Sequence, residues 1–503
     1  MPKNSTIKIA LLLLGAIILG ALLREAMFKV AAKKTTTSYV PALQINGDIK
    51  NPLTLLDEAE FDSVDFEYKG ERKRGIPLAS IIQSTEPITE KHEILFIGED
   101  GLSALIDGSN LDGCHILLSE NGWEAINLLH PVSSNVKRLK EIIIIAPDAP
   151  LNFGVNIISQ TENLAYFTPG QLYKETGVQM PYFEGTSTVT NDGGQNSVSI
   201  FTRRQLYPLR DLVDFSEAEQ FVVMGAKGET LYTSDPGFLQ VNKNFLNYFS
   251  LDRENEIIEN VKGFMIAPPS RSITDLYHDT LHYLQRDEKV LLLFLDGFGY
   301  HQYEYAKENG YIPFLSTLPQ AEKALSVYQP VTNAGFAAMI TGKTPDENGV
   351  YSRDQMDLKT PSIFAMAKQL GKESALIEGH IKILNTEIEP VLNIDLNGDG
   401  KNEDEIYSTA LEYVKDANYD LIMVHFHSID DAGHSYGDLH ENTMEQLKVV
   451  DGYVRDLVEA WKGKVIILAD HGMHSTEDAG NHGEFRYEDL IVPYIIAEGG
   501  RIE

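Results

Sequence analysis

The sequence contains a single cysteine, Cys114, in 503 residues. One thiol excludes intrachain disulfides and metal sites built from several thiolates. Any bound metal must therefore be held by histidine and carboxylate side chains. We expect Cys114 itself to be a buried, small apolar residue.

Positive charge is also scarce. There are 42 Lys and Arg residues against 74 Asp and Glu, which gives a formal net charge of −32. A nucleic-acid groove needs a concentrated basic surface, so this composition argues against nucleic acid as a partner. With 43% hydrophobic and 23% charged residues the chain is otherwise ordinary globular material. Its length predicts two to four domains.

The one long apolar run lies at the N-terminus, over residues 9–23. It is shorter than the roughly 17 to 25 residues of a typical membrane-spanning helix. The lysine and arginine that flank it can extend their charged ends to the interface. We predict that residues 1–35 form a signal-anchor, a single transmembrane helix. The alternative is a signal peptide cleaved after 30–32. Both place the remaining chain outside the cytoplasm, and the signal-anchor would hold it at the cell membrane.

Three short apolar segments further along the chain end in metal-binding residue types. Residues 290–295 run into Asp296, residues 421–426 precede Asp430, and residues 464–469 run into an Asp-His pair. Such segments are typical of buried parallel strands, whose carboxyl ends meet at one edge of a sheet. The apolar stripe of residues 441–461 predicts a helix directly before the third strand. This order indicates a doubly wound, mostly parallel α/β sheet.

The residues at these strand ends favour divalent metal binding. Asp430 and His434 are four residues apart, Asp470 and His471 are adjacent, and His482 follows in a Gly-Asn-His-Gly sequence. Oxygen and imidazole ligands suit Zn²⁺ or Mn²⁺, and there are enough for two ions. Two cations about 3.5 to 4 Å apart can stabilise an in-line phosphoryl displacement.

A possible nucleophile lies between the first and second strands. Thr332 and Asn333 precede a short alanine-rich run that ends at Thr341. A threonine at this position predicts a helix N-cap, with backbone N–H groups that can bind an anion. A helix-capping role alone would explain a threonine at position 332, without any catalytic role.

Taken together, residues 288–499 resemble the alkaline phosphatase superfamily. The resemblance is nearest to its nucleotide pyrophosphatase/phosphodiesterase branch, the type I phosphodiesterases, and to the related phosphonoacetate hydrolases. It implies that Thr332 attacks phosphorus, forms a phosphothreonine and is released by water. It also implies one metal held by Asp296, Asp470, His471 and Thr332, and a second held by Asp430, His434 and His482.

Two positions depart from the nucleotide-cleaving branch. Gly335 stands where that branch usually has asparagine, so Asn333 is our candidate for the phosphate contact, as in the phosphonoacetate hydrolases. The aromatic pair that would grip a nucleobase is not assignable, and Phe298, Tyr300 and Tyr351 are only candidates. These departures bear on the substrate more than on the reaction.

Several neighbours of the ligands carry alternative interpretations. His425 and His427 alternate along a strand, so we expect one to face the site and the other to pack. Asp431 could replace Asp430 as a ligand, although the Asp-x-x-x-His spacing favours Asp430. Two further polar residues are candidates for contacting the ligands: His474 and Glu484.

A separate acidic loop resembles a calcium-binding loop, with Gly400 at its turn. Its twelfth position is Ile406 rather than glutamate. We leave open bound Ca²⁺ and a plain acidic turn. The candidate ligands are Asp395, Asn397, Asp399 and Lys401.

The region before the proposed catalytic domain is expected to be rich in strands. Residues 39–147 resemble the molybdopterin-binding fold of sulfite-oxidase-like proteins through 43–47, 75–82, 98–101 and 136–142. Cys114 is not in the setting of that family's metal-binding thiolate. We therefore expect this fold without molybdopterin.

The next region repeats the first. Residues 207–213, 221–228 and 261–268 follow the order and spacing of 76–82, 94–101 and 139–147, which indicates a duplicated unit. We expect a platform or partner-binding role for the pair, with no partner identified. The predicted divisions are 1–35 (anchor), 36–150 and 151–270 (β-rich α+β modules), and 285–503 (metallohydrolase), with a helix at 273–285 leading into the last.

The function that the resemblance implies is a membrane-anchored, extracytoplasmic, metal-dependent phosphodiesterase or phosphatase acting on a small phosphate ester. Diesters and pyrophosphates are slightly favoured over monoesters. A sulfatase is disfavoured because the Cys/Ser-x-Pro-x-Arg sequence is absent at the nucleophile, and a phosphoglycerate mutase would carry serine there. The alternatives are an envelope or adhesion scaffold with a weakly active hydrolase domain, and a phosphonate-type hydrolase.

Overall fold

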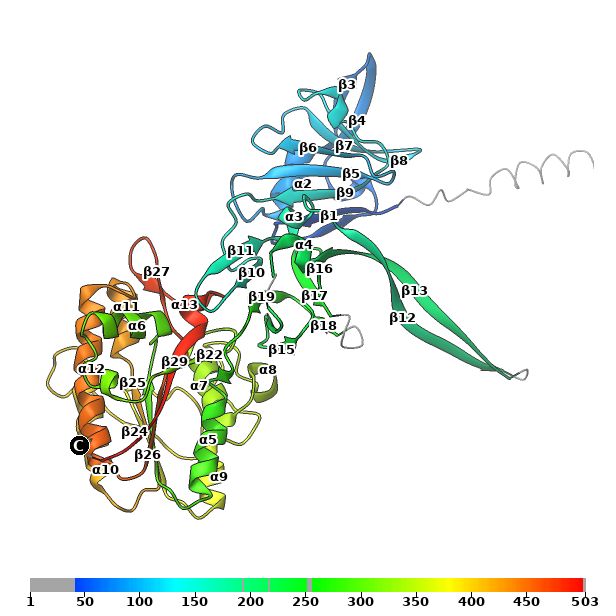
Figure 1. Cartoon of the computed structure of the whole chain (residues 1–503). Helices are drawn as coiled ribbons and strands as arrows, with labels where there is room; N and C mark the ends of the chain where they lie inside the picture. Colours follow the sequence, from blue (N-terminus) through cyan, green and yellow to red (C-terminus); the bar gives the residue numbers. More distant parts are fainter. Residues whose placement is uncertain (1–40, 192–193, 216–217, 251–255, 501–503) are drawn as a thin grey trace, which may run out of the picture.

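The computed structural model describes residues 41–191, 194–215, 218–250 and 256–500. Figure 1 shows an α/β domain formed by the C-terminal half, with two smaller strand-rich modules above it. The predicted signal-anchor at residues 1–35 lies outside the described residues. Among those that are described, no helix is both long and apolar enough to cross a membrane.

An eight-stranded sheet forms the centre of the C-terminal domain, in the order β20-β22-β29-β26-β21-β25-β23-β24. The central strand β21 pairs in parallel with β25 and β26, and β29 is the antiparallel member beside β26. The strands are β20 (Arg271–Ser272), β21 (Val290–Leu295), β22 (Glu322–Leu325), β23 (Ser374–Glu378), β24 (Val391–Leu392), β25 (Leu421–Phe426), β26 (Lys464–Leu468) and β29 (Ile491–Glu498).

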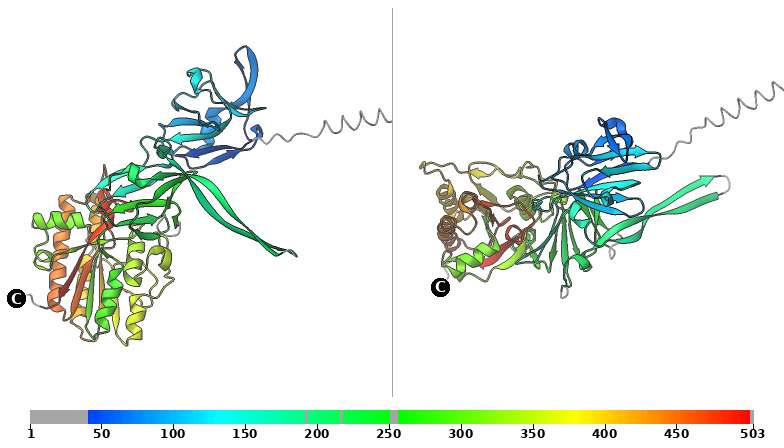
Figure 2. Two further views of the ribbon diagram at one scale, coloured as in Figure 1. Left: turned by 45° about the vertical axis from the view of Figure 1, so that its right-hand side comes forward. Right: turned by 90° about the horizontal axis from the view of Figure 1, so that it is seen from above.

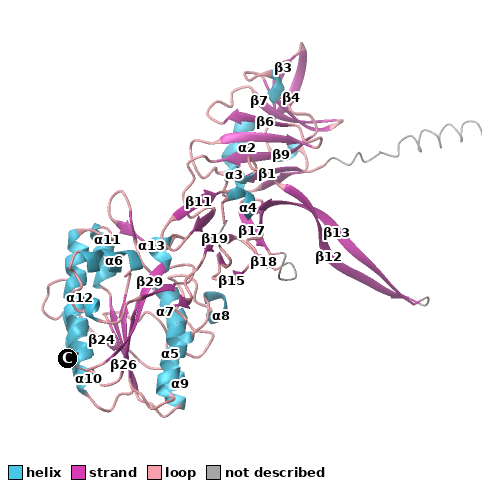
Figure 3. Cartoon of the chain, in the orientation of Figure 1, coloured by secondary structure: helices cyan, strands magenta, loops and turns pink. Residues whose placement is uncertain are grey.

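Helices cover both faces of this sheet (Figure 3). One face carries α5 (Asp275–Leu284), α7 (Thr332–Thr341) and α9 (Ile363–Gln369), which contact one another. The other carries α6 (Tyr300–Glu308), α10 (Glu403–Lys415), α11 (Ser428–Tyr436) and α12 (Glu441–Ala460). Shorter helices are α8 (Pro345–Asn348) and α13 (Tyr487–Leu490). The predicted doubly wound, mostly parallel sheet is confirmed, as are the helices expected at 273–285 and 441–461.

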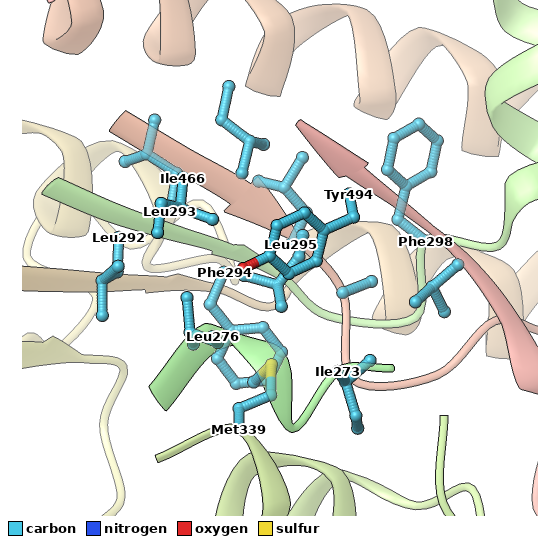
Figure 4. Close-up of a cluster of buried hydrophobic side chains, with 14 of the residues drawn as sticks. Ile273, Leu276, Leu292, Leu293, Phe294, Leu295, Phe298, Met339, Ile466 and Tyr494 are labelled. Carbon is cyan, nitrogen blue, oxygen red and sulfur yellow. The ribbon is translucent and has the colours of Figure 1, made fainter. Parts of the chain in front are cut away.

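The apolar sequence of β21 follows from this layering. Every residue of β21 is buried, because helices pack on both faces of the strand. Figure 4 shows Phe294 close to Leu276 of α5 and Met339 of α7. Packing from both sides fixes the strand whose carboxyl end carries Asp296.

Each N-terminal module contains a five-stranded sheet, and the two sheets have the same order and strand directions. In the first, β1 is parallel to β9, which pairs with β5 in the antiparallel direction, and in the second β10, β19 and β14 do the same. The orders are β2-β1-β9-β5-β6 and β11-β10-β19-β14-β15. This repetition is what a duplicated unit would give. The division into modules at 36–150 and 151–270 stays a prediction.

The strands of the first sheet are β1 (Leu43–Gly47), β2 (Leu53–Leu55), β5 (Glu93–Gly98), β6 (Ser103–Asp107) and β9 (Leu139–Ile145). Those of the second are β10 (Val155–Ile158), β11 (Asn163–Phe167), β14 (Phe221–Gly225), β15 (Thr230–Thr233) and β19 (Val261–Ile266). Each module has a second sheet. In the first module its strands are β3 (Val64–Tyr68), β4 (Glu71–Pro77), β7 (Cys114–Ser119) and β8 (Gly122–Asn127). In the second module they are β12, β13, β16 (Phe238–Asn242), β17 (Phe245–Phe249) and β18 (Ile257–Ile258). The helices of these modules are α2 (Leu78–Thr85), α3 (Pro169–Leu172) and α4 (Leu209–Leu212).

Cys114 lies at the start of β7 and is 1% exposed. Burial raises the pKa of its thiol to about 11. Cys114 is therefore a buried apolar residue, as expected.

A long hairpin, β12 (Val178–Asn191) and β13 (Gly194–Pro208), extends from the second module. In the views of Figures 1 and 2 it points away from the remaining chain. Phe183 and Phe201 pair across its strands, with ring centroids 5.4 Å apart, and both are largely exposed. The sequence reasoning did not anticipate this arm.

A buried carboxylate joins the two modules. Asp48, directly after β1, is fully buried and accepts hydrogen bonds from the backbone N–H groups of Ala146 and Gly170, both at 2.8 Å. The Thr168 hydroxyl also donates to it, at 2.7 Å. Burial outweighs these bonds and raises the pKa of Asp48 from 3.8 to about 6.

This pKa predicts a pH-dependent stability. Between pH 3.8 and about 6 the folded chain keeps a proton that the unfolded chain has released. The stabilisation from that proton is complete below 3.8 and is lost as the pH rises through about 6, by at most about 3 kcal/mol. We expect Asp48→Asn to remove this part of the pH dependence of the free energy of unfolding. The measurement is urea unfolding at a series of pH values, followed by tryptophan fluorescence. The same pH dependence in the variant and in wild type would contradict the assignment.

Candidate metal centre and active site

The proposed ligands converge at the carboxyl ends of three adjacent strands. Asp296 directly follows β21, Asp470 follows β26 after one residue, and Asp430 lies in α11 just beyond β25. Because these strands are parallel neighbours, their ends lie together. The expected shared site is therefore at this edge of the sheet.

Asp296, Asp470 and His471 form the first group. The Nε2 atom of His471 lies 3.2 Å from Asp470 Oδ2 and 3.4 Å from Asp296 Oδ1. All three side chains are at least 96% buried. Oxygen and nitrogen atoms of this group lie within 4.8 Å of one another, close enough for a common metal ion.

The proposed second group is Asp430, His434 and His482. Among the described residues, ligand atoms of Asp430, His471 and His482 lie within 4.8 Å of one another, whereas His434 is not part of such a cluster. Asp430 and His434 are four residues apart on α11, so they share a face of the helix, and His434 Nε2 lies 3.4 Å from Asp430 Oδ2. His482 Nε2 lies 3.6 Å from Asp430 Oδ1. The rings of His482 and His471 stack with centroids 3.8 Å apart, which places the two groups side by side.

Each histidine of these groups is oriented in the same way. Nδ1 of His471, His482 and His434 lies 2.9, 2.8 and 3.3 Å from the backbone oxygens of Gly472, Pro330 and Gly480, respectively. An N–H at Nδ1 leaves Nε2 as an acceptor, and in each ring Nε2 faces the carboxylates, with that of His482 also accepting from Arg353 at 2.6 Å. This is the tautomer that a metal ligand needs.

The carboxylates indicate that a cation belongs here. Burial and the neighbouring Asp296 charge raise the pKa values of Asp430 and Asp470 well above their usual range. Desolvation also acts on Asp296, but His425 and His427 overcome it and hold that pKa well below normal. Within the described part of the chain, Asp296 Oδ1, Asp430 Oδ1 and Asp470 Oδ2 are buried without a hydrogen-bond partner. Divalent cations fit this donor set and would satisfy these oxygens.

The histidines also favour the neutral state. Burial lowers the pKa of His471 to about 4 and that of His482 to about 2. Both imidazoles are therefore unprotonated near neutral pH, as metal binding requires.

Thr332 lies beside the first group. It is the first residue of α7, and its Oγ1 lies 3.5 Å from His471 Nε2. The expectation that Thr332 caps the helix is wrong, because Val331 occupies the N-cap. The helix itself is confirmed. A helix start of this kind can bind an anion through its first N–H groups.

Close packing of α7 against Asp470 explains the glycine at position 335. A Cβ at this position would lie 2.6 Å from Asp470 Cβ and 2.9 Å from the Asp470 backbone oxygen. Only glycine lets α7 approach the ligand-bearing strand end this closely. The departure from the asparagine of the nucleotide-cleaving branch is therefore coupled to how Asp470 is positioned.

Asn333 faces a loop in this structure. Its Nδ2 donates to the backbone oxygens of Gln355 and Ile383, at 2.9 and 3.2 Å.

A cationic residue that the sequence reasoning missed lies nearer to the ligands. Arg353 donates from Nη2 to His482 Nε2 at 2.6 Å. The phosphate contact assigned to Asn333 stays a prediction, and Arg353 is a second candidate.

His425 and His427 both belong to the site, where one was expected to pack elsewhere. They contact Asp296 and also Glu378, a buried carboxylate at the end of β23. Sequence reasoning missed Glu378, since a lone glutamate at the end of a strand gives no signal. His474 instead pairs with Asp489 at 2.7 Å, and its Nε2 lies 3.8 Å from Glu484.

Other candidates fall in different surroundings. Phe298 and Tyr300 are buried in the core cluster, whereas Tyr351 is half-buried. Asp431 is exposed and lines a cavity of about 930 Å³ beside His434. We call this the His434 cavity, and its polar lining includes His380, Lys401, Asp431, His434 and Glu445.

The acidic loop forms one wall of this cavity. Asp395 accepts hydrogen bonds from the backbone N–H groups of Gly398 and Gly400, and Asn397 and Asp399 accept from those of Asp399 and Lys401. These bonds lower the pKa of Asp395. Lys401 donates to Gln446 Oε1 at 2.7 Å. Bound Ca²⁺ stays a prediction.

Comparison with known proteins bears on the C-terminal domain. Residues 380–494 match the family model of type I phosphodiesterase / nucleotide pyrophosphatase, which confirms the predicted relationship. This stretch includes five proposed ligands and excludes Asp296 and Thr332.

Two curated relatives carry the same name, GPI ethanolamine phosphate transferase 3. The protein from Schizosaccharomyces pombe is 23% identical over 190 residues, 36% of this chain and 20% of the relative. That from Eremothecium gossypii is 36% identical over 67 residues, 13% of this chain and 6% of the relative. The chain thus spans a fifth or less of these relatives.

Solved structures also match in part. Murine ectonucleotide pyrophosphatase / phosphodiesterase 5 has a TM-score of 0.32 and 17% identity, covering 38% of this chain and 58% of that one. Phosphonoacetate hydrolase from Sinorhizobium meliloti 1021 has a TM-score of 0.31 and 15% identity, covering 37% and 57%.

Proposed function

We propose that this chain, whose residues 380–494 are of the type I phosphodiesterase / nucleotide pyrophosphatase family, is a metal-dependent enzyme that cleaves phosphate esters with Thr332 as nucleophile. The observation that supports it most is the position of the Thr332 hydroxyl, 3.5 Å from His471 Nε2 and next to buried carboxylate oxygens that lack partners. The apolar run at residues 9–23 supports a membrane anchor with the enzyme outside the cytoplasm.

The residues have separate roles in this proposal. Asp296, Asp470 and His471 would hold one divalent cation with Thr332. The second would be held by Asp430, His434 and His482. Zn²⁺ is our first choice and Mn²⁺ the second. Bound cations would lower the pKa of the attacking hydroxyl and offset the negative charge of the transferred group.

The reaction has two steps. Thr332 Oγ1 loses its proton and forms a bond to phosphorus while the bond between phosphorus and the leaving oxygen breaks, which gives a phosphothreonine and a leaving group that takes up a proton. Water then attacks phosphorus while the bond to Oγ1 breaks, and one proton of the water restores the threonine hydroxyl. The start of α7 and the Arg353 guanidinium supply positive potential for the anionic group in an otherwise acidic chain.

The reaction class is testable with two chromogenic substrates. Full-length protein freed of metal by a chelator should turn over neither bis(p-nitrophenyl) phosphate nor p-nitrophenyl phosphate. Zn²⁺ or Mn²⁺ should restore turnover, with the diester preferred. Undiminished activity after complete metal removal would overturn the proposal.

A second candidate is transfer of the phosphoryl group to an alcohol rather than to water. The relatives named as ethanolamine phosphate transferases raise this possibility, and the His434 cavity gives it a location. This cavity adjoins the second ligand group through His434. Carboxylates outnumber lysine in its lining, with Asp431 and Glu445 facing it against Lys401. Such a lining suits a substrate with an ammonium group.

The cavity predicts a substrate preference. Full-length enzyme should show a kcat/KM roughly fivefold higher for 2-aminoethyl p-nitrophenyl phosphate than for the ethyl ester, because partly exposed ion pairs contribute up to about 1 kcal/mol. Glu445→Gln should reduce this ratio without changing turnover of the ethyl ester. Equal kcat/KM values at low salt would contradict an ammonium site.

A further inference from the structure

Asp296 ends a chain of buried polar side chains that crosses three neighbouring strands. His425, in β25, lies between Glu378 at the end of β23 and Asp296 beyond β21. His425 Nδ1 is 2.9 Å from Glu378 Oε2, and His425 Nε2 is 3.0 Å from Asp296 Oδ2. Glu378, His425 and Asp296 are 1%, 0% and 3% exposed, so water does not compete for these bonds.

Aromatic packing fixes the ring of His425. Phe294 stacks on it with centroids 3.7 Å apart and planes 11° from parallel. Phe336 of α7 meets the same ring edge-on at 5.7 Å. With its plane held by Phe294 and both nitrogens engaged, the imidazole has one orientation available.

This orientation determines which oxygen of Asp296 is free. Oδ2 is occupied by His425, whereas Oδ1 is buried without a hydrogen-bond partner among the described residues and lies 3.4 Å from His471 Nε2. The carboxylate therefore presents a single free oxygen to the first ligand group. We propose that His425 and Glu378 are positioning residues, which hold Asp296 so that Oδ1 can bind a divalent cation. The inference rests on the proposed function, since it assumes that Asp296 is a ligand.

His427 braces the same assembly. Its Nδ1 lies 3.5 Å from Asp296 Oδ2 and its Nε2 lies 3.5 Å from Glu378 Oε2. Asp296, His425 and His427 are also close enough to hold an ion of their own. Each nitrogen of His425 lies at hydrogen-bond distance from a carboxylate oxygen, so without an ion the ring bridges Glu378 and Asp296. The number of ions bound in the test below separates this bridge from a third metal site.

The test is metal affinity in the full chain, measured by competition with a chelator. We expect wild type to bind two Zn²⁺ ions, and His425→Gln and Glu378→Gln to bind at least one of them roughly 10- to 100-fold more weakly, as for other residues that orient ligands. Glu378→Gln keeps an acceptor oxygen and should lose less than His425→Gln.

A matched control is His301→Gln. His301 makes a comparable bond, from Nε2 to Asp438 Oδ2 at 2.7 Å, but neither residue is a proposed ligand. This variant should keep wild-type affinity. The thermal midpoint of each metal-free protein separates the two roles, since a merely structural residue would lower the midpoint and leave the affinity unchanged.

The outcomes are distinguishable. If wild type binds no divalent cation, the proposed function fails. If wild type binds two and both variants bind as tightly as wild type, the positioning role is overturned while the proposed function stands. Three ions in wild type, with one lost in His425→Gln, would also overturn it in favour of a third metal site.

Discussion

Thr332→Ala should lower kcat for bis(p-nitrophenyl) phosphate by roughly 10³- to 10⁶-fold, the range seen when a nucleophile is removed. The substitution deletes the one hydroxyl placed against His471 Nε2. The metal content should stay at the wild-type level, because the other proposed ligands are three aspartates and three histidines. Steady-state kinetics and metal analysis of the same preparation check both statements.

Thr341→Ala is the matched control for this variant. Thr341 ends the same helix, is buried, and bonds its hydroxyl to the backbone oxygen of Ala337 at 2.6 Å. Its loss should leave kcat unchanged. Thr332→Ser, which restores a hydroxyl, should recover part of the activity. Full activity of Thr332→Ala with a complete metal complement would exclude the proposed nucleophile.

Asp470→Asn should have opposite effects on activity and on the stability of the metal-free protein. We expect kcat/KM to fall on the order of 10³-fold, because a charged ligand is removed from the first group. Without metal, the Asp470 carboxylate is buried beside Asp296 and Asp430, and its pKa is raised well above normal. A raised folded-state pKa means that this group stabilises the fold at low pH and ceases to do so as the pH rises.

At about pH 8 the metal-free Asp470→Asn protein should therefore melt at a higher temperature than metal-free wild type. The comparison is a thermal scan of both proteins in chelator. Asp438→Asn provides the contrast. That carboxylate is buried, but hydrogen bonds from His301 and Ser475 overcome desolvation and lower its pKa, so its loss should lower the midpoint. A lower midpoint for metal-free Asp470→Asn would contradict the repulsion on which the metal assignment depends.

The sequence was sufficient for the arrangement of the ligands because parallel strands bring their carboxyl ends together. Once 290–295, 421–426 and 464–469 were interpreted as neighbouring strands, Asp296, Asp430 and Asp470 had to share one edge of the sheet. Asp430 and His434, four residues apart, share one face of α11, a helix that the sequence analysis did not predict. Their roles as metal ligands stay a proposal.

Residues that approach the site across the fold gave no such signal. Glu378 reaches His425 from a strand 47 positions away in the sequence, and Arg353 reaches His482 from a loop 129 positions away. The N-cap was wrongly assigned for a local reason, since the pattern favoured the hydroxyl of Thr332 while the backbone begins the helix one residue earlier. The hairpin β12-β13 was missed because its strands have no core to impose an alternating pattern.

The most direct measurement is anomalous X-ray scattering from crystals of the full-length protein grown with Zn²⁺. Two peaks about 4 Å apart are predicted, one among Asp296, Asp470, His471 and Thr332, the other among Asp430, His434 and His482. No peak at the ends of β21 and β26, or Thr332 turned away from the peaks, would contradict the account.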